Sequence, residues 1–285
     1  MQREEINTRK DRTGEGLRKG MRAQFAFKPG RLPRHLFRAW PEIASRVRTA
    51  DFIAVLLDFD GTLVNFRPRP GDVRLSVQTR RALEAMVRHP NLLLAIISGR
   101  KLRTLREIIG VDGIRCIGLH GAEEAGKSQG MSQRSRKSIL GARRLAESKL
   151  HALPKVWVEG KGLSFAVHYR GAAEASVKAA DRILCGILAP VRDALRVLRG
   201  NQVWEVVPRE ILGKGAAVRD LLDELPGKTL AVYVGDDDTD ESAFAALPDE
   251  ITARVGRVRG TKAKYYLRNP DEVRQFLQRL ERTLP

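Results

Sequence analysis

The chain has 285 residues, of which 42% are hydrophobic and 30% charged, and these proportions exclude a disordered or fibrous protein. Its apolar runs are shorter than the roughly eighteen residues of a membrane span, and its charged N-terminus lacks the apolar segment of a secretory signal. Two cysteines, Cys116 and Cys185, are too few for a disulfide framework. We therefore expect a cytoplasmic protein without a membrane partner.

The formal net charge is +18, and the first fifty residues hold thirteen Lys and Arg against five Asp and Glu. Residues 1–50 are interpreted as a basic N-terminal extension that is largely loop or disordered, within which residues 36–50 have the spacing of a short helix. A positive surface attracts polyanions without specificity and would also favour an anionic substrate. We expect no specific nucleic-acid partner.

From residue 51 onward, strand and helix patterns alternate. Continuous apolar runs at 52–59, 91–99 and 114–121 predict strands that are buried on both faces of a parallel sheet. The two segments between these strands have apolar residues at helical spacing. Ser76 is a suitable N-cap for the first helix, and Gly110 ends the second.

After Gly121 the pattern changes to helices at 139–153 and 172–193 with short strands around them. The segments 155–162 and 163–170 predict a hairpin, and 195–208 predicts a second strand pair. Alternation of helices and buried strands then resumes from residue 214 to the C-terminus.

This order of elements predicts an α/β fold, a Rossmann-like parallel-sheet core with an inserted α+β cap domain. The predicted core comprises residues 51–120 and 200–285, and the predicted cap comprises residues 121–199. The hinges between them are expected near Gly121 and at 199–203.

Chemically capable side chains follow the predicted strands of the core. In an open α/β sheet, ligands bind beyond the carboxyl ends of the strands. The residues in these positions are Asp58, Asp60, Ser98, Asp236 and Asp240, with Lys214 ahead of a helix. Carboxylate oxygens are suitable ligands for Mg²⁺, and the hydroxyl and the ammonium group are suitable partners for a phosphate.

The spacing of Asp58 and Asp60 suggests a division of roles. An ionised Asp can attack phosphorus, and a second carboxyl group two residues later can transfer the protons. Gly61 lets the backbone turn sharply and brings N–H groups near a phosphate, and Thr62 leads into the next element.

Four motifs together resemble those of the haloacid dehalogenase phosphatase superfamily. They are "DFDGTL" at 58–63, "SGR" at 98–100, the lysine at 214 and "GDDDTDE" at 235–241, in that family's order. The resemblance implies a haloacid dehalogenase-like core with a cap of the second (C2) type.

Other segments are similar to those of trehalose-6-phosphate phosphatases. They are "GLHGAE" at 118–123, "VEGKGLSFAVHYR" at 158–170 and "WEVVP" at 204–208. This resemblance implies Mg²⁺-dependent hydrolysis of trehalose 6-phosphate through an aspartyl-phosphate, as a step of trehalose biosynthesis. A separate trehalose-phosphate synthase is then expected to supply the substrate.

The resemblance also implies roles for individual residues. Asp58 is the nucleophile and a metal ligand, Asp60 is the general acid/base, and its backbone carbonyl binds the metal. The implied phosphate-binding residues are Ser98 and Lys214, and the further metal ligands are Asp236 and Asp240. The candidate substrate-binding residues are Gly61, Thr62, Gly99, Arg100, His120, Gly121, Glu123, Glu159, Lys161 and His168.

Several points stay open at this level. His168 suits a structural role in the cap as well as a sugar contact, and of Asp237 and Asp238 one is expected to support the metal and the other to lie exposed. Val207 occupies the place of the basic residue that the family usually has before the proline, and Arg209 follows that proline.

Two alternative functions remain. The first is the same chemistry on another sugar phosphate, such as sucrose 6-phosphate or a mannosyl or glucosyl phosphoglycerate. The second is a catalytically silent regulatory protein that binds polyanions through its basic N-terminus.

Overall fold

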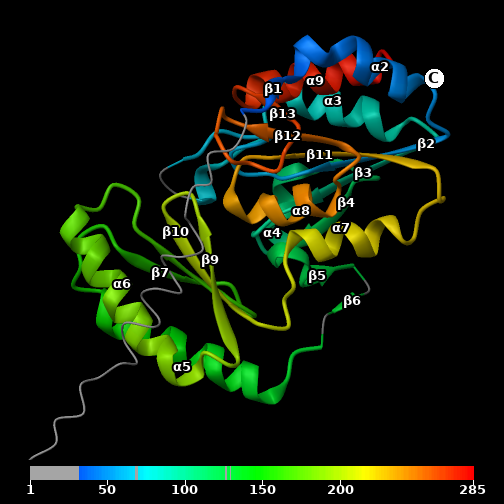
Figure 1. The fold of residues 1–285 in the computed structure, drawn as a ribbon. Coiled ribbons are helices and arrows are strands. Elements are labelled where there is room, and N and C mark those ends of the chain that lie inside the picture. Colours follow the sequence, from blue (N-terminus) through cyan, green and yellow to red (C-terminus); the bar gives the residue numbers. More distant parts are fainter. Residues whose placement is uncertain (1–31, 68–69, 126, 129) are drawn as a thin grey trace, which may run out of the picture.

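The computed structural model describes residues 32–67, 70–125, 127–128 and 130–285, so most of the predicted N-terminal extension lies outside the described residues. Two sheets organise the described part of the chain: a nine-stranded sheet in the core and a four-stranded sheet in the cap. Figure 1 shows the core at the top and the cap at the lower left. The two parts confirm the predicted α/β core with an inserted cap.

The core sheet is parallel over most of its width. Its strands, in spatial order, are β1 (Arg34–His35), β13 (Tyr265–Leu267), β12 (Ile251–Val255), β11 (Thr229–Gly235), β2 (Phe52–Leu57), β3 (Leu92–Ile97), β4 (Arg115–Gly118), β5 (Glu123–Glu124) and β6 (Lys127–Ser128). In this spatial order, each pair of neighbouring strands from β1 through β13, β12, β11, β2 and β3 to β4 is parallel. β5 and β6 then add an antiparallel edge. The chain extends the sheet from β2 in both directions, so the strand order reverses at β2.

Both faces of the sheet are covered because its strands are apolar on both sides. In β2, the side chains of Ile53, Val55 and Leu57 pack into one hydrophobic cluster, and those of Ala54 and Leu56 pack into another. The first cluster lies under α2 (Trp40–Arg48), α3 (Val77–Val87), α4 (Leu102–Ile109) and α9 (Pro270–Glu281), and the second under α7 (Lys214–Leu222) and α8 (Glu241–Ala246).

The predicted helix ends are confirmed. The Ser76 hydroxyl accepts a hydrogen bond from the backbone N–H of Thr79 and caps α3. Gly110 ends α4 with a left-handed φ of 52°, a conformation that costs a glycine little.

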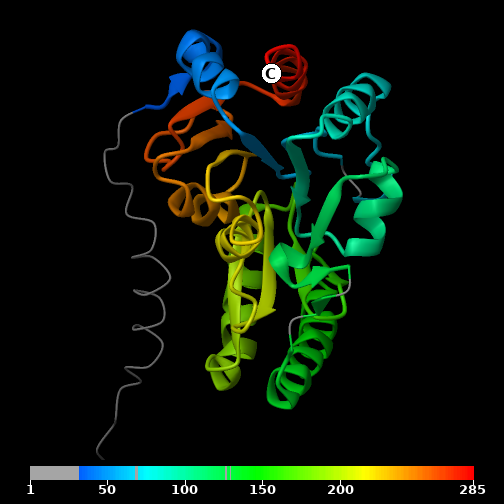
Figure 2. The same cartoon turned by 90° about the vertical axis from the view of Figure 1, so that its right-hand side faces the viewer.

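The cap has a hydrophobic core of its own. Its antiparallel sheet has the order β7 (Trp157–Gly160), β8 (Phe165–His168), β10 (Val203–Pro208) and β9 (Leu195–Gly200), and α5 (Gln133–Leu150) and α6 (Glu174–Leu188) cover it. Figure 2 shows both helices extending away from the core. The predicted hairpin of β7 and β8 is present, with strands paired from Trp157 opposite His168 to Gly160 opposite Phe165.

The predicted boundary between cap and core needs correction. β10 pairs with β8 from Val203 to Val206 and with β9 from Val203 to Pro208, so the hairpin of β9 and β10 belongs to the cap, which extends to Pro208. β5 pairs with β4, so the core extends to Ser128. The chain therefore enters the cap after Ser128 and returns between Pro208 and Lys214, not near Gly121 and at 199–203. Local patterning predicts that a strand exists but not which sheet it joins.

The core also begins earlier than residue 51. β1 pairs with β13, and α2 packs Trp40, Ile43 and Val47 into the larger hydrophobic cluster. The short helix predicted in this segment is present, but residues 34–48 are an integral layer of the core rather than part of a loose extension. No helix in the described ranges combines the length and the hydropathy that crossing a bilayer requires.

This assignment predicts that truncating Ile43 destabilises the whole core. Ile43 is 1% exposed, and Ile43→Ala should lower the free energy of unfolding by about 2–4 kcal/mol because a cavity replaces the side chain. Urea denaturation monitored by circular dichroism measures this change. Arg48→Ala, on the exposed side of the same helix, is the control and should change it by less than about 0.5 kcal/mol. Equal stability of both variants would show that α2 is not part of the core.

Candidate active site

Three neighbouring strands bring the predicted catalytic residues to one edge of the core sheet. β2 is flanked by β11 and β3, and these strands are followed by Asp58, Asp236 and Ser98 respectively. Lys214 is the first residue of α7, which packs against α8 beneath the same sheet. The residues come together at the reversal of strand order, where ligands bind in open α/β sheets.

A buried lysine links two of the carboxylates. The Lys214 Nζ lies 2.6 Å from Asp58 Oδ1 and 2.8 Å from Asp240 Oδ1. Their relative exposures are 3% for Lys214, 4% for Asp58 and 0% for Asp240. The hydroxyl of Tyr233 donates a further hydrogen bond of 2.7 Å to Asp240. Both carboxylates thus have charged partners in a region from which water is largely excluded.

The negative charge of this group exceeds what Lys214 compensates. Burial raises the pKa of Asp58 from 3.8 to about 7; Lys214 opposes the shift and Asp240 adds to it. Burial together with the charges of Asp58 and Asp240 raises the pKa of Asp236 well above its usual range. Carboxyl groups with raised pKa values favour an additional positive charge nearby.

The residues present fit a divalent cation. Asp58, Asp236 and Asp240 each offer an oxygen, and these three atoms lie within 4.8 Å of one another. Oδ1 of Asp236 is buried and has no hydrogen-bond partner within the described part of the chain. Gly61 has a φ of +85°, and a Cβ there would lie 2.2 Å from Asp236 Oδ2, so the close packing requires glycine.

Asp60 is held by Arg100. The guanidinium donates two hydrogen bonds to the Asp60 carboxylate, of 2.6 Å from Nε and 2.7 Å from Nη2. The Arg100 guanidinium also lies 5.4 Å from the centroid of the Phe59 ring. Arg100, a predicted substrate-binding residue, thus forms a bidentate pair with the predicted acid/base, a geometry that suits a carboxylate.

The two predicted hydroxyl groups lie beside these residues. Ser98 is 1% exposed, and its Oγ accepts a hydrogen bond of 3.2 Å from the backbone N–H of Arg100. The Thr62 hydroxyl donates to Asp58 Oδ2 over 3.4 Å.

A second polar cluster joins the cap to the core around Glu205. Its Oε2 lies 3.0 Å from Lys161 Nζ and 3.1 Å from His120 Nε2, and its Oε1 accepts a hydrogen bond of 3.0 Å from Ser164. Lys161 also donates to the backbone carbonyl of Gly99 over 3.0 Å, which is a direct contact from the cap to the core. A Cβ on Gly99 would lie 2.6 Å from His120 Nε2, so glycine leaves room for this cluster.

Sequence reasoning missed Glu205. Burial opposes its ionisation, but the charges of Lys161 and His120 and their hydrogen bonds outweigh burial and hold the pKa of Glu205 far below its usual range. The available signal was a single acidic residue within the apolar strand segment "VWEVVP", since an acid is rarely buried without partners.

Glu159 and His168 form a neighbouring pair on β7 and β8. His168 Nε2 lies 2.9 Å from Glu159 Oε2, and the His168 ring stacks on Trp157 with 4.0 Å between centroids. Burial opposes the ionisation of Glu159, but the His168 hydrogen bond and the Lys161 charge outweigh burial and lower its pKa. His168 therefore holds Glu159 in position, which supports a structural role for it.

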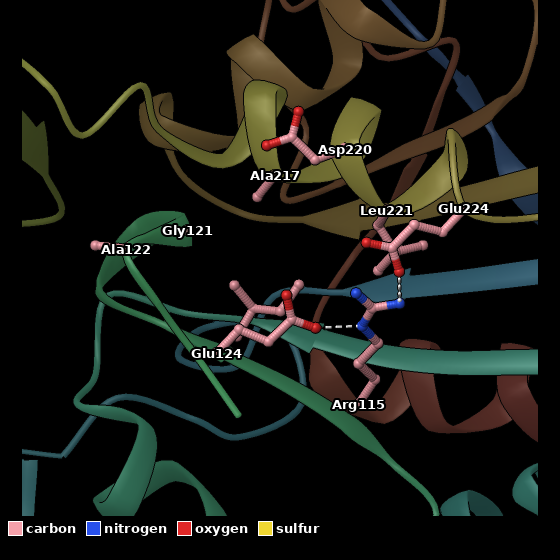
Figure 3. Close-up of a pocket in the computed structure, with 9 residues that line it drawn as sticks. Arg115, Gly121, Ala122, Glu124, Ala217, Asp220, Leu221 and Glu224 are labelled. Atoms are coloured by element: carbon pink, nitrogen blue, oxygen red, sulfur yellow. Dashed lines mark hydrogen bonds and ion pairs between the residues drawn. The ribbon is translucent and has the colours of Figure 1, made fainter. Parts of the chain in front are cut away.

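Two predicted substrate-binding residues have other positions. The Glu123 carboxylate accepts a hydrogen bond of 2.8 Å from the Leu102 N–H and caps the first turn of α4. Gly121 lies against Ala217 and lines a separate pocket of about 290 Å³. In Figure 3 this pocket lies between α7 and the β4–β5 edge, with Arg115 paired to Glu124 and Glu224. Its charged side chains are one cation, Arg115, and three carboxylates, Asp220, Glu124 and Glu224, so the lining carries a net negative charge.

Comparison with known proteins identifies the relationship that these features suggest. The family model described as trehalose-phosphatase matches residues 56–271. The chain belongs to the trehalose-phosphatase family. The trehalose-phosphate phosphatase of Mycobacterium ulcerans is 32% identical over 241 residues, which cover 80% of this chain and 61% of that protein. The chain thus spans about three fifths of the length of the curated relatives it matches.

Solved structures confirm the fold of this trehalose-phosphatase family member. The C-terminal domain of trehalose-6-phosphate phosphatase from C. albicans has a TM-score of 0.73 at 21% identity and covers 90% of this chain and 100% of that chain. A haloacid dehalogenase-like hydrolase from Bacteroides thetaiotaomicron has a TM-score of 0.57 at 15% identity and covers 80% and 99% respectively. The predicted haloacid dehalogenase-like class is therefore confirmed.

The sequence left open whether Arg209 replaces the basic residue that the trehalose-phosphatase family usually has in the place of Val207. Val207 is fully buried between core and cap with Leu119, Ala122 and Ile211. The Arg209 side chain donates to the Arg192 carbonyl over 2.8 Å. Arg196 lies opposite Val207 in the β9–β10 ladder and donates to the Ile211 carbonyl. The residue that pairs with Val207 on the neighbouring strand is therefore basic.

Asp237 and Asp238 differ in their surroundings. The Asp237 N–H donates to Asp240 Oδ2 over 2.9 Å, so this residue supports a predicted metal ligand through its backbone. The side chain of Asp238 is half exposed and lies 3.3 Å from Arg254.

The Glu205 cluster predicts a stability change with a defined pH dependence. Glu205→Gln leaves Lys161 and His120 without a buried counter-charge and should lower the free energy of unfolding by about 3 kcal/mol at pH 7. Since the folded pKa of Glu205 lies below its ordinary value of 4.5, this contribution is fully present above pH 4.5 and is lost as the pH falls further. Urea denaturation at pH 7, 5 and 3.5 measures it, with the exposed Glu281→Gln as control. A difference from wild type that does not shrink below pH 4.5 would contradict the assignment.

Proposed function

We propose that the chain is a Mg²⁺-dependent phosphomonoesterase that hydrolyses trehalose 6-phosphate to trehalose and phosphate. The observation that carries the proposal is the buried group of Asp58, Lys214, Asp236 and Asp240 at the strand ends, next to a cap that presents Lys161 and Glu205. Membership of the trehalose-phosphatase family supports this choice of substrate.

Asp58 acts as the nucleophile. One of its carboxylate oxygens forms a bond to phosphorus while the bond from phosphorus to the sugar oxygen breaks, which gives an aspartyl-phosphate. The sugar oxygen leaves as a hydroxyl with a proton from Asp60. In the second step Asp60 takes a proton from water, the resulting hydroxide attacks phosphorus, and phosphate leaves with the Asp58 carboxylate regenerated.

The other residues of the core stabilise the charge on the phosphoryl group. Lys214 offers a fixed ammonium group beside the nucleophile, and Ser98 offers a hydroxyl. Arg100 orients Asp60 through its bidentate pair. Asp58, Asp236 and Asp240 would hold Mg²⁺, with the Asp60 backbone carbonyl as a further ligand, and the ion would neutralise phosphate charge as a Lewis acid.

The cap supplies the groups that recognise a disaccharide. Glu159, Lys161 and Glu205 are partly or fully buried, are charged, and lie at the surface where the cap contacts the core. Carboxylates and an ammonium group that already share hydrogen bonds can exchange them for bonds to sugar hydroxyls. A hydroxyl-rich, uncharged disaccharide fits this donor and acceptor set.

The substrate and the nucleophile can be tested together. Phosphate release should be strongest with trehalose 6-phosphate in a panel that includes sucrose 6-phosphate, glucose 6-phosphate and a mannosyl phosphoglycerate. Asp58→Asn should lower kcat by more than about 1,000-fold because the nucleophile is lost, whereas the exposed Asp72→Asn should retain wild-type turnover.

The same assay tests the metal. Removal of divalent cations with a chelator should abolish turnover, and Mg²⁺ should restore it. Preference for another sugar phosphate would support the proposed phosphatase reaction but contradict trehalose 6-phosphate as its substrate. Turnover of no member of the panel would favour the alternative of a catalytically silent regulatory protein.

The cap residues should control substrate affinity rather than the chemistry. Glu159→Gln should lower kcat/KM for trehalose 6-phosphate by about tenfold to a hundredfold, through the loss of a charged hydrogen bond. Turnover of the small substrate p-nitrophenyl phosphate should change less than twofold because it lacks the sugar. Glu174→Gln, an exposed change on the cap helix α6, is the matched control. Equal losses on both substrates would place Glu159 outside sugar recognition.

A further inference from the structure

The turn between β9 and β10 reaches from the cap to the loop that follows β11 in the core. The backbone N–H of Asn201, in this turn, donates a hydrogen bond of 3.1 Å to Oδ2 of Asp237. Asp237 is adjacent to Asp236 and binds Asp240 through its own N–H. The cap therefore contacts the candidate metal loop directly, through a turn that the sequence motifs do not include.

The shape of the turn depends on Gly200. A Cβ at this position would lie 2.9 Å from Asp237 Oδ2 and 2.8 Å from Val203 Cγ1, so a larger residue would displace the Asp237 carboxylate or the Val203 side chain. Gln202 has a positive φ of 60°, which is uncommon for a residue with a side chain. Its carbonyl accepts a hydrogen bond of 3.2 Å from the Tyr169 N–H, which helps to hold the turn in this form.

Arg170 extends the contact to a second core segment. Its guanidinium donates to the Asn201 carbonyl over 2.9 Å and lies 4.8 Å from the centroid of the Phe66 ring. Phe66 comes from the loop after β2, and a Cβ on Gly61 would lie 2.7 Å from its Cζ. The Phe66 ring thus lies over the same glycine that packs against Asp236, and a cation on its face is favourable.

We propose that Asn201, Arg170 and Phe66 form a latch that holds the cap closed on the Asp236 side of the site. Lys161 donates a hydrogen bond to the Gly99 carbonyl and so holds the cap to the core on the other side of the site, at the loop after β3. The three latch residues are positioning residues: they act on the reaction by setting the cap position. The inference rests on the proposed function only in that the closed cap is the form that binds the sugar phosphate.

The location of these contacts favours a role in closure over a role in folding. The Asn201–Asp237 hydrogen bond and the Arg170–Phe66 contact each join a cap residue to a core residue, and neither belongs to the hydrophobic core of the cap. Phe66 is 37% exposed, so the ring adds little to the core of the protein. If the cap opens, both contacts break while each part keeps its own sheet and core.

A pair of substitutions isolates the latch hydrogen bond. Asn201→Pro removes the N–H that binds Asp237, and Asn201→Ala removes the same side chain but keeps the N–H. The two central residues of the turn are Asn201 and Gln202, and of these only Gln202 has a positive φ. This is the pattern of a type II turn. Such a turn accepts proline at its first central position, which is that of Asn201. Gly200 is extended in β9, as a residue before proline must be.

We expect Asn201→Pro to raise the KM for trehalose 6-phosphate by about tenfold relative to Asn201→Ala, because a hydrogen bond to a charged group no longer favours the closed form. The value of kcat should change less than twofold, since bound substrate still closes the cap. Hydrolysis of p-nitrophenyl phosphate should be unaffected. Equal KM values for the two variants would overturn the proposal.

The cap position can be measured without substrate. Spin labels at Ser148→Cys on α5 and Gln275→Cys on α9, both exposed positions, in a Cys185→Ser background report the distance between cap and core. Asn201→Pro should shift the distance distribution to longer values, and Asn201→Ala should leave it unchanged. A shifted distribution in a protein that does not hydrolyse trehalose 6-phosphate would keep the latch and refute the proposed function. Identical distributions would overturn the latch whatever the substrate is.

A second pair covers the case in which Asn201→Pro does not fold. Arg170→Met and Phe66→Leu, alone and together, form a double-mutant cycle on the KM and on the label distance. The latch predicts that the double variant is no worse than Arg170→Met alone, whereas independent residues would give additive effects and overturn it. The exposed cap residue Arg182→Met controls for loss of positive charge.

Discussion

The ion pairs of Lys214 with Asp58 and Asp240 are the constraint on which the site depends. A lysine that is 3% exposed is stable as a cation only with carboxylates around it, and buried carboxylates require a cation in turn. The three groups come from the end of β2, the start of α7 and the loop after β11, so the sheet must be complete before the pairs can form. Lys214 does not balance all the carboxylates, and one buried oxygen of Asp236 has no hydrogen-bond partner among the residues that the structure describes. The same arrangement that pairs Asp58, the proposed nucleophile, with a lysine therefore leaves a place for a further positive charge.

Much of this could be predicted from the sequence because the determinants are local. Ser76 and Gly110 mark helix ends through their own hydrogen-bonding and conformational preferences, and apolar runs such as 52–57 mark buried strands. The order of strands and helices then brings Asp58, Ser98 and Asp236 to a common edge, because parallel strands present their carboxyl ends together. For the same reason the location of the residues at the strand ends was predicted more completely than the bounds of the cap.

The features that were missed depend on partners distant in the sequence. β1, β5, β6 and β13 have two or three residues each, and they become strands only because a neighbouring strand offers hydrogen-bonding groups. Glu205 lies 44 residues from Lys161 and 85 from His120, so no spacing rule connects them. Arg100 could be placed near the site, but its pairing with Asp60 follows from the geometry of the two loops. The boundaries of the cap were predicted wrongly for the same reason, because pairing across the sheet, not position along the chain, decides which sheet a strand joins.

Asp237 joins the cap to the loop that carries the candidate metal ligands Asp236 and Asp240. Its N–H binds the carboxylate of Asp240, and its own carboxylate binds the N–H of Asn201 in the cap. A change in the position of Asp240 must therefore move the acceptor to which the cap is attached. With the proposed latch, binding that orders this loop and closure of the cap would favour one another, and by thermodynamic reciprocity each would strengthen the other equally. The closed cap contacts the core on both sides of the site, at Asp237 and at the Gly99 carbonyl, so a substrate that separates Lys161 from Gly99 would still leave the other side attached.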